Sequence, residues 1–390
     1  MKPIQFEFAT ATRILFGTGK VSEAGRIART FGSRALLVTG SGLERASAIM
    51  PSLREQGIET AILNVCGEPD TSLIERGVEL ARAHRSELVL GIGGGSVIDT
   101  GKAIAALLGN PGELLDYLEV VGRGRTFENA SVPCIAIPTT AGTGAEVTRN
   151  SVLAVPSKKV KVSLRSPHLL PRLAIVDPEL TYDLPAAITA YTGLDALTQL
   201  IEAFVCSRAN PLADALCREG IGRAARALPV LGSDLQDKAA REDMALASLF
   251  GGLALANAGL GAVHGLAGPI GGMFPAPHGA ICAALLPLVM RTNLRALSER
   301  APGGSELKRY GEVAGILTGN PHATAEEGIA WVARLTTSLR IPPLRNWGIE
   351  ESDVPEIVSN AVRASSMKAN PILLSTEEVS GIMRSALAQH

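Results

Sequence analysis

The chain has few aromatic residues and almost no net charge. Aromatic residues make up 4% of its 390 residues, and 37 basic against 38 acidic side chains give a formal net charge of −1. The sequence contains no basic block interleaved with aromatic residues, a pattern typical of proteins that bind nucleic acid or a charged membrane surface. We therefore expect a small-molecule partner, and neither nucleic acid nor a membrane.

Long apolar runs and paired cysteines are also missing. No segment reaches the roughly 18 consecutive apolar residues of a membrane-spanning helix. The N-terminus alternates apolar and polar residues where a signal peptide would have an apolar core, and this alternation predicts a strand. The five cysteines show no CxxC spacing and lie mostly in apolar segments, where a free thiol packs as a small hydrophobic group. They are Cys66, Cys134, Cys206, Cys217 and Cys282. Such cysteine usage favours the reducing cytoplasm.

The first part of the chain alternates short β-branched runs with helical patterns such as Leu73 to His84. Strand, helix, strand repetition predicts a parallel sheet with helices on its faces, and such sheets bind ligands at the carboxyl ends of their strands. The expected strands are Ala35 to Thr39, Glu59 to Val65, Leu88 to Gly91, Cys134 to Pro138 and Leu173 to Val176.

From Asp183 onward the β-branched runs stop, and long Ala/Leu patterns are broken only by clusters of glycine and proline. Asp183 is expected to cap the first of these helices, with Pro185 in its first turn. The change predicts two domains, an α/β domain over residues 1–182 and an all-helical domain over residues 183–390.

The segment LVLGIGGGSVIDTGKAIAA, residues 88–106, indicates an anion site. Its glycines follow an apolar run and precede a helical pattern that starts at about Ser96, so the free N–H groups of the first helical turn face the glycine turn. The pattern GxGxxG fails at Ser96, and the Walker pattern fails because five residues separate Gly95 from Gly101. A pyrophosphate would fit here; a turn whose glycines serve packing alone is the alternative.

A second loop, PTTAGTGAE at residues 138–146, follows the expected strand CIAI. Its three threonine hydroxyls could hydrogen-bond a ribose, an adenine or a nicotinamide amide. Taken alone, the loop fits a solvated turn equally well.

The third set combines a carboxylate, an amide and two imidazoles. Asp195 and Gln199 lie four residues apart on one predicted helix and so point the same way. His264 lies in GAVHGLAG, and the Gly/Pro-rich connection after it could bring His278 of FPAPHG back beside it. Together they could bind a borderline divalent metal, although each histidine alone fits an ordinary core or loop position. The other histidines form no rival cluster: His84, His168, His322 and His390.

These segments together resemble the iron-containing (group III) alcohol dehydrogenase family, which includes maleylacetate reductases and, more distantly, glycerol dehydrogenase and dehydroquinate synthase. The similarity runs almost from end to end. The segments that show this similarity are GGGSVIDTGKAIA, PTTAGTGAEVT, SPHLLPRLAIVDPELTYDLP, GLDALTQLIEAF, VHGLAGPIGG and FPAPHG. The resemblance implies the dehydroquinate synthase-like fold: an α/β dinucleotide-binding domain with a parallel sheet, then an all-α domain that binds metal and substrate. It also implies a homodimer or a larger homo-oligomer.

The resemblance also implies roles for individual residues. Asp195, His264 and His278 fall on metal-ligand and catalytic positions, with Gln199 at the fourth ligand position, and the metal would be iron(II), with zinc as the alternative. The residues implied to bind NAD(P) are Gly40, Ser41, Gly94, Gly95, Ser96, Asp99, Thr139, Thr140, Thr143, Lys161 and Leu180.

Three positions depart from the family pattern. Gln199 replaces the usual fourth ligand, a histidine, and Gly268 replaces a histidine that helps to relay protons in many members. The proton is therefore expected from water, a ribose hydroxyl or the substrate. Gly40 and Ser41 stand where NAD-specific members place an aspartate for the ribose hydroxyls, so repulsion of a 2′-phosphate is removed.

The sequence thus predicts an oxidoreductase that transfers a hydride between NAD(P)(H) and a small alcohol, aldehyde or ketone, with a divalent metal polarising the substrate oxygen. One alternative is a metal-independent enzyme similar to maleylacetate reductase that acts on an acidic oxo compound; the retained Asp195 argues against it. The other alternative is a dinucleotide-binding protein without turnover.

Overall fold

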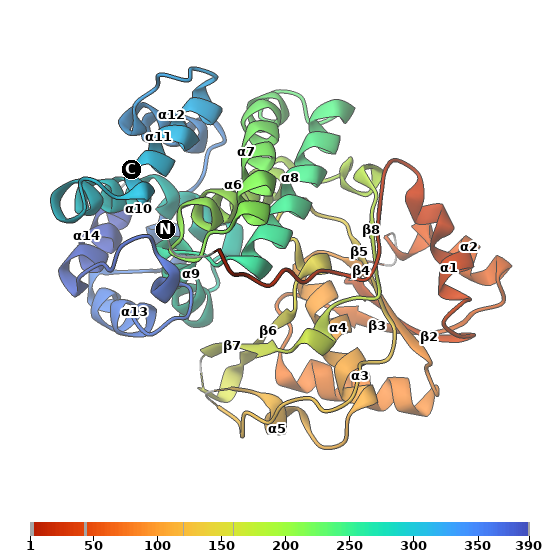
Figure 1. Cartoon of the computed structure of the whole chain (residues 1–390). Coiled ribbons are helices and arrows are strands. Elements are labelled where there is room, and N and C mark those ends of the chain that lie inside the picture. The colour runs from red at the N-terminus through yellow and green to blue at the C-terminus, as the bar shows by residue number, and fades with distance from the viewer. Residues whose placement is uncertain (1–3, 43–44, 120, 159, 389–390) are drawn as a thin grey trace. The chain divides into compact units, whose positions relative to one another are not determined.

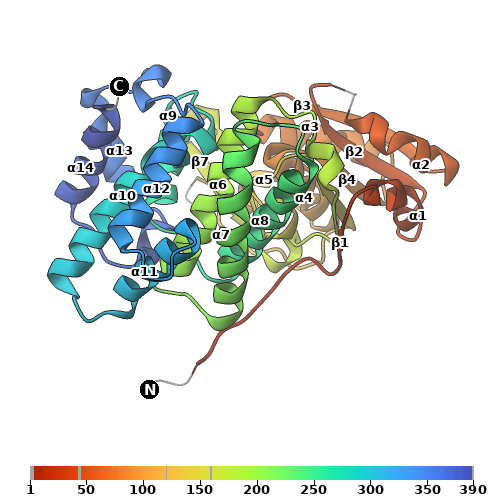
Figure 2. The same cartoon turned by 90° about the horizontal axis from the view of Figure 1, so that it is seen from above.

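The structure, a computed structural model, describes residues 4–42, 45–119, 121–158 and 160–388. The chain divides into two compact units (Figures 1 and 2). One comprises Ala9–Asp183, and the other comprises Leu184–His390 together with Met1–Phe8. Because each unit has its own core, the two are described separately.

The first unit is built on a six-stranded, wholly parallel sheet of order β1-β8-β5-β4-β2-β3. The five expected strands are present, and an N-terminal strand of three residues adds to one edge. In sheet order the strands are β1 (Ile14–Phe16), β8 (Leu173–Val176), β5 (Cys134–Pro138), β4 (Leu88–Gly93), β2 (Arg34–Gly40) and β3 (Glu59–Val65).

Helices cover both faces of this sheet because each central strand is apolar on both sides. In β2, Ala35 and Leu37 belong to the core shared with α1 (Ala24–Ala28) and α2 (Met50–Glu55). Leu36 and Val38 belong to the opposite core. That second core is shared with α3 (Thr71–Ala83), α4 (Gly95–Gly109) and the one-turn α5 (Leu114–Tyr117) (Figure 1). The fold class predicted for this part of the chain is confirmed.

A two-stranded antiparallel sheet, formed by β6 (Asn150–Val155) and β7 (Val160–Arg165), was not among the expected strands. Alternate residues of β6 are buried. The alternation of VKVSLR after the turn residues Pro156 and Ser157 was the signal that could have predicted it.

The described part of the second unit is helical. Its helices are α6 (Ala186–Val205), α7 (Pro211–Leu231), α8 (Lys238–Asn257), α9 (Ala262–Met273), α10 (His278–Arg300), α11 (Ser305–Thr318), α12 (Ala325–Ser338), α13 (Val354–Ala361) and α14 (Thr376–Leu387). Figure 2 shows α6, α7 and α8 packed side by side. Helix α10 is long and apolar enough to cross a membrane, but 78% of its most apolar window is buried within the fold, as in a core helix.

The predicted start of the first long helix is wrong by a few residues. Helix α6 begins at Ala186 with Pro185 as its N-cap residue, and no side chain caps it. Asp183 is exposed and lies before this cap. Because the fixed φ of proline already suits the cap position, the helix can start without the carboxylate.

Short 3₁₀ helices complete the described secondary structure: η1 (Lys20–Glu23), η2 (Ala46–Ala48), η3 (Ala145–Val147), η4 (Pro156–Lys158), η5 (Pro167–Leu169), η6 (Pro178–Thr181), η7 (Leu344–Trp347), η8 (Glu351–Asp353) and η9 (Met367–Ala369).

Candidate functional site

The candidate dinucleotide-binding residues follow four neighbouring strands of the sheet. Gly40 ends β2, Gly94 follows β4, Thr139 follows β5, and Leu180 lies in η6 after β8. Since these strands are parallel and adjacent, their carboxyl ends meet at one edge. The fold therefore brings together residues that are far apart in the sequence, at the edge where parallel sheets bind ligands.

Two glycines of the turn after β4 differ in what surrounds them. A Cβ at Gly95 would lie 2.9 Å from the side chain of Thr143, so this glycine lets the glycine turn and the threonine loop pack together. A Cβ at Gly94 would lie 3.5 Å from Thr140, an ordinary contact, and the backbone at Gly94 is extended. Packing therefore explains the glycine at 95 but not the one at 94, where an approaching ligand would explain it.

A buried lysine joins α4 to the threonine loop. Lys102 is fully buried, and its ammonium donates to the Ala145 carbonyl at 2.8 Å and to the Thr148 hydroxyl at 3.0 Å. Its ion pair with Asp99 is 2.9 Å long, and the Val152 amide donates to the other oxygen of that carboxylate at 2.9 Å. The Asp99 carboxylate thus has internal partners and supports the loop. The sequence analysis missed Lys102; a single cation within the apolar GKAIAALL was the available signal.

Two cations lie among these loops. Arg45, which the sequence analysis also missed, donates from its guanidinium to the Thr139 hydroxyl. Lys161 lies on β7, and its ammonium is 3.3 Å from the carboxylate of Glu68. Lys161 shares its charge with an acidic partner, whereas Arg45 donates to neutral oxygens of Thr139.

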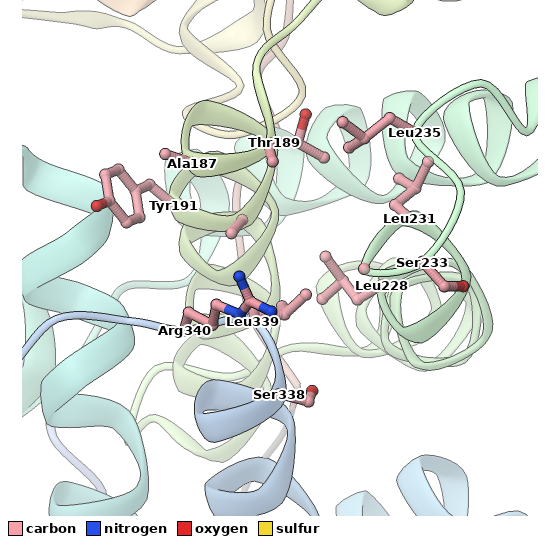
Figure 3. Close-up of a pocket in the computed structure, with 13 residues that line it drawn as sticks. Ala187, Thr189, Tyr191, Leu228, Leu231, Ser233, Leu235, Ser338, Leu339 and Arg340 are labelled. Atoms are coloured by element: carbon pink, nitrogen blue, oxygen red, sulfur yellow. The ribbon is translucent and has the colours of Figure 1, made fainter.

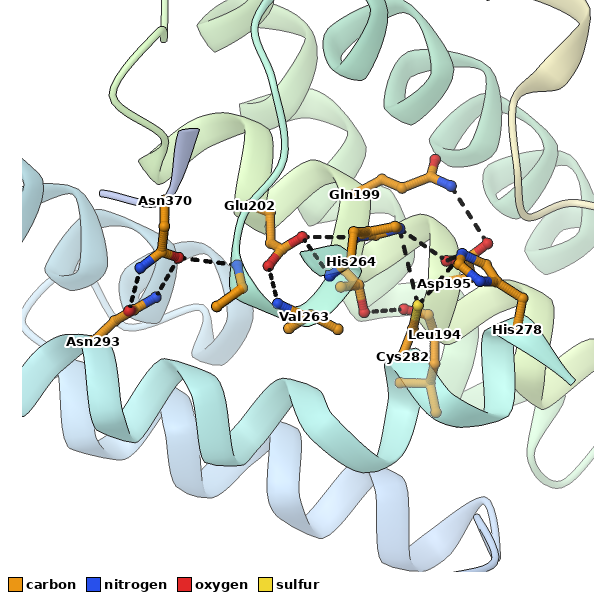
Figure 4. A network of polar contacts seen from close by, with 12 residues as sticks. Leu194, Asp195, Gln199, Glu202, Val263, His264, His278, Cys282, Asn293 and Asn370 are labelled. Atoms are coloured by element: carbon orange, nitrogen blue, oxygen red, sulfur yellow. Dashed lines mark hydrogen bonds and ion pairs between the residues drawn. The ribbon is translucent and has the colours of Figure 1, made fainter. Parts of the chain in front are cut away.

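In the helical unit, four potential metal ligands converge (Figure 4). One oxygen of Asp195, on α6, lies 3.4 Å from Nε2 of His264, on α9, and 3.8 Å from Nε2 of His278, on α10. The Sγ atom of Cys282, on α10, lies 3.9 Å from Nε2 of His264 and 3.7 Å from that of His278. The four ligand atoms all lie within 4.8 Å of one another. We call these four residues the donor cluster.

The donor cluster fits a divalent cation. Oδ1 of Asp195 is buried and has no hydrogen-bond partner among the described residues, which is costly for a carboxylate oxygen unless a cation faces it. Burial alone would raise the pKa of Asp195, but the positive charge of the facing rings of His278 and His264 in their protonated form holds it below its usual value. A carboxylate, two imidazoles and a thiol are a donor set that zinc and related metals accept.

Glu202 fixes the orientation of one imidazole. Nδ1 of His264 lies 2.6 Å from the Glu202 carboxylate, which also accepts a hydrogen bond from the Val263 amide at 2.7 Å. When a metal binds, this carboxylate can keep a proton on Nδ1 of His264, which leaves Nε2 to donate its lone pair to the metal. The carboxylate, on α6 two turns beyond Asp195, thereby prepares His264 for a metal.

The first turn of α9 is held by the side chains of Glu202, on α6, and of Asn370, which follows η9. Besides the Glu202 contacts, the Ala262 amide donates at 3.0 Å to Asn370, which also exchanges hydrogen bonds with Asn293 (Figure 4). A Cβ at the N-cap residue Gly261 would lie 2.7 Å from the Glu202 carboxylate. Glycine is therefore needed at 261 for this capping, which sets the position of His264.

A second close approach places His278. A Cβ on Gly279, the second residue of α10, would lie 2.3 Å from the Tyr191 carbonyl of α6. Only glycine permits this contact between helices. It brings the start of α10 against α6 one turn before Asp195, so that His278 reaches the carboxylate.

Gln199 lies beside the cluster. Its amide nitrogen is 3.4 Å from Oδ2 of Asp195, and its amide oxygen is buried without a hydrogen-bond partner among the described residues. The structure thus brings together Asp195, His264 and His278, as the sequence suggested, and the amide group of Gln199 lies against the Asp195 carboxylate.

The sequence analysis missed Cys282 as a donor. Its position one turn after His278, in HGAIC, was the signal that could have found it.

A pocket of 440 Å³ lies elsewhere in the helical unit (Figure 3). The start of α6, the end of α7 and the segment after α12 line it, with Thr189, Leu228 and Arg340 among its residues. None of the described residues that line this pocket belongs to the donor cluster.

Known proteins match both units of the chain. Residues 11–178 match the family described as iron-containing alcohol dehydrogenase, and residues 189–387 match the C-terminal domain of the same family. The 1,3-propanediol dehydrogenase of Klebsiella pneumoniae is 37% identical over 98% of each chain. The NAD-dependent methanol dehydrogenase of Bacillus methanolicus is 33% identical over 96% of this chain and 97% of its own. A crystal structure of 1,3-propanediol oxidoreductase has a TM-score of 0.91 at 35% identity, covering 98% of this chain and 100% of that one.

The Glu202 contact gives a first prediction. In Glu202→Gln an amide nitrogen can face Nδ1 of His264, which favours the tautomer with its proton on Nε2, toward the cluster. We expect affinity for zinc to fall about 10- to 100-fold, as measured by competition with a chromophoric chelator. Glu219→Gln, on the exposed face of α7, is the control and should leave the affinity unchanged. Equal affinity of Glu202→Gln and the unmodified protein would contradict the assigned role.

Proposed function

The chain belongs to the iron-containing alcohol dehydrogenase family, and from this membership we propose that it moves a hydride between NAD(P)(H) and a small primary alcohol or its aldehyde. It is a metal-containing oxidoreductase that uses a nicotinamide dinucleotide. The relatives named for 1,3-propanediol and methanol support a short alcohol as substrate. The observation that carries the proposal is the buried, unpartnered oxygen of Asp195 facing two imidazole nitrogens.

We infer that Asp195, His264 and His278 hold the metal and are the catalytic residues. When bound, the divalent metal supplies a Lewis acid that polarises the substrate oxygen. The protein keeps these donors ready: Glu202 retains the proton of His264 on Nδ1, and burial keeps Asp195 away from water. The side chain of His278 is 35% exposed, against 7% for His264, so the cluster opens on the His278 side, where substrate would enter.

The glycine at position 268 limits which groups can supply the proton. This residue lies on α9 one turn after His264, and a Cβ there would meet no described atom within 4 Å. Position 268 thus has room beside it but no side chain that could carry a proton. The proposed donor remains water, a ribose hydroxyl or a group of the substrate.

The dinucleotide supplies the hydride chemistry, and the residues at the sheet edge would position it. We infer that the first turn of α4, with Gly94, Gly95 and Ser96, binds the pyrophosphate through backbone N–H groups. The other residues inferred to line the dinucleotide are Gly40, Ser41, Thr139, Thr140, Thr143, Lys161 and Leu180. Asp99 is placed close by, with its carboxylate bound to Lys102 and the Val152 amide. Arg45, a cation at the Thr139 hydroxyl, supports acceptance of the 2′-phosphate of NADP(H).

The comparisons favour neither alternative function. A metal-independent reductase would not need the donor cluster, and a protein without turnover would not need the Glu202 contact that orients His264.

We also propose a cytoplasmic location, which the five free cysteines support. The proposed assembly of two or more copies rests on the family resemblance alone.

The direct test of the proposed function is metal removal. Protein dialysed against a strong chelator should lose reduction of a short aldehyde by NADH or NADPH, because the substrate oxygen is no longer polarised, and added zinc or iron(II) should restore it. Cofactor absorbance measures the rate, and elemental analysis measures the metal. Full activity in protein shown to be free of metal would favour the metal-independent alternative.

The glycine turn gives another prediction. Gly94→Ala adds a methyl group where the protein has room but a pyrophosphate would lie, so dinucleotide affinity should fall at least about tenfold, or about 1.4 kcal/mol. Gly101→Ala, on the same helix, is the matched control, since its Cβ also makes only ordinary contacts, the nearest at 3.6 Å. Titration by cofactor fluorescence compares the two variants. Equal affinities would place the pyrophosphate elsewhere.

The end of β2 gives a prediction about cofactor choice. A Cβ at Gly40 would meet no described atom within 4 Å, so Gly40→Asp should fold normally while its carboxylate repels the 2′-phosphate of NADPH. We expect the ratio of kcat/KM for NADPH to that for NADH to fall at least about tenfold. Gly40→Asn keeps the shape without the charge and should change the ratio little. A parent protein that strongly prefers NADH would contradict the argument.

A further inference from the structure

The donor cluster contains a thiol that neither the family resemblance nor the proposed function uses. Cys282 is completely buried and lies on α10 one turn after His278, on the same side of the helix. Its Sγ lies 3.7 Å and 3.9 Å from the two imidazole nitrogens that face Asp195. The thiol therefore points into the place where a metal would be held.

Gln199 is the competing candidate for a fourth ligand, and its geometry argues for a different role. Its amide nitrogen faces Oδ2 of Asp195. Its amide oxygen, the atom of this group that could bind a metal, points away from the donor cluster (Figure 4). An amide nitrogen carries two hydrogens and has no lone pair to donate to a metal. Gln199 is thus a positioning residue that binds one carboxylate oxygen and leaves Oδ1 to the cluster.

We propose that Cys282, as a thiolate, is the fourth protein ligand of the metal, and that the resulting carboxylate, two-imidazole and thiolate set makes this chain select zinc over iron(II). The thiol gives its proton to solvent as the metal binds. Two anionic ligands then neutralise a divalent ion within a buried site, which lowers the cost of removing that charge from water. Thiolate is a soft ligand that favours zinc among the metals of this family.

The proposal rests on the proposed function, because it assumes a metal at Asp195, His264 and His278. It also explains why the helix can carry an amide at position 199. The Cys282 thiolate on α10 replaces the histidine that the family pattern has at position 199 on α6. The metal therefore still has four protein ligands, although the fourth comes from a different helix.

Cobalt(II) is the probe for the thiolate. Protein stripped of metal and loaded with cobalt(II) should show a near-ultraviolet thiolate-to-cobalt charge-transfer band as well as visible ligand-field bands. Cys282→Ala and Cys282→Ser should lose the charge-transfer band. Cys217→Ala, which changes a completely buried cysteine of the same unit outside the cluster, should keep it. A cobalt protein without the band, or a Cys282 variant that retains it, would overturn the assignment.

Zinc selectivity has its own test. Metal-free protein offered equimolar zinc and iron(II) under anaerobic conditions is analysed for both metals. The zinc-to-iron ratio should be at least about tenfold higher for the unmodified protein than for the double variant Gln199→His, Cys282→Ala, whose ligands are one carboxylate and imidazoles. Equal ratios would refute the selectivity.

A measurement on the unmodified protein covers the case in which the Cys282 variants fail to fold. X-ray absorption by zinc in the zinc-loaded protein should show one sulfur neighbour at about 2.3 Å. A zinc shell of nitrogen and oxygen alone would exclude Cys282 as a ligand. Binding of cobalt and aldehyde reduction without a thiolate signal would overturn this proposal alone, whereas no metal binding at all would overturn the proposed function as well.

Discussion

The carboxylate of Glu202 is the contact on which the metal-binding half of the protein depends. This carboxylate, on α6, accepts hydrogen bonds from the Val263 amide and from the His264 ring. One buried group therefore caps α9 and favours the tautomer of His264 that carries its proton on Nδ1. Because Asp195 lies on the same helix, the carboxylate that would bind a metal and the one that prepares its imidazole ligand are held in fixed relation. The glycine at 261 follows from this arrangement, since a side chain there would displace the carboxylate.

In the α/β unit, a buried cation has the corresponding role. Lys102 ties α4 to the threonine loop and carries the charge that allows Asp99 to be buried. Removing one partner of such a pair typically costs about 3–5 kcal/mol, since the other charge is left uncompensated. The contacts of Lys102 therefore fix the threonine loop at this edge of the sheet, while the backbone of the loop remains available to a ligand.

The fold was largely predictable where the local pattern agrees with the tertiary environment. The expected strands Cys134–Pro138 and Leu173–Val176 match β5 and β8, because a strand buried on both faces is apolar throughout and clearly bounded. Glu59–Val65 matches β3, an edge strand that is partly exposed. The β6–β7 hairpin was not expected, because its strands alternate buried and more exposed residues and lack the unbroken apolar runs of β5 and β8. Asp183 was expected to cap α6 because a carboxylate before a proline suits that role, yet the proline itself takes the cap position.

The sequence by itself determined the fold class and the glycine turn after β4, since apolar periodicity and motif spacing act over short range. The grouping of Asp195 with His264 and His278 came from the resemblance to a known family. Only the tertiary structure revealed Cys282 as a donor, Glu202 as the partner of His264 and Lys102 as the support of the threonine loop. Each of these roles depends on where a side chain from one helix ends against another element. That placement is decided by close approaches such as Gly279 against Tyr191, and spacing along the chain carries no information about them.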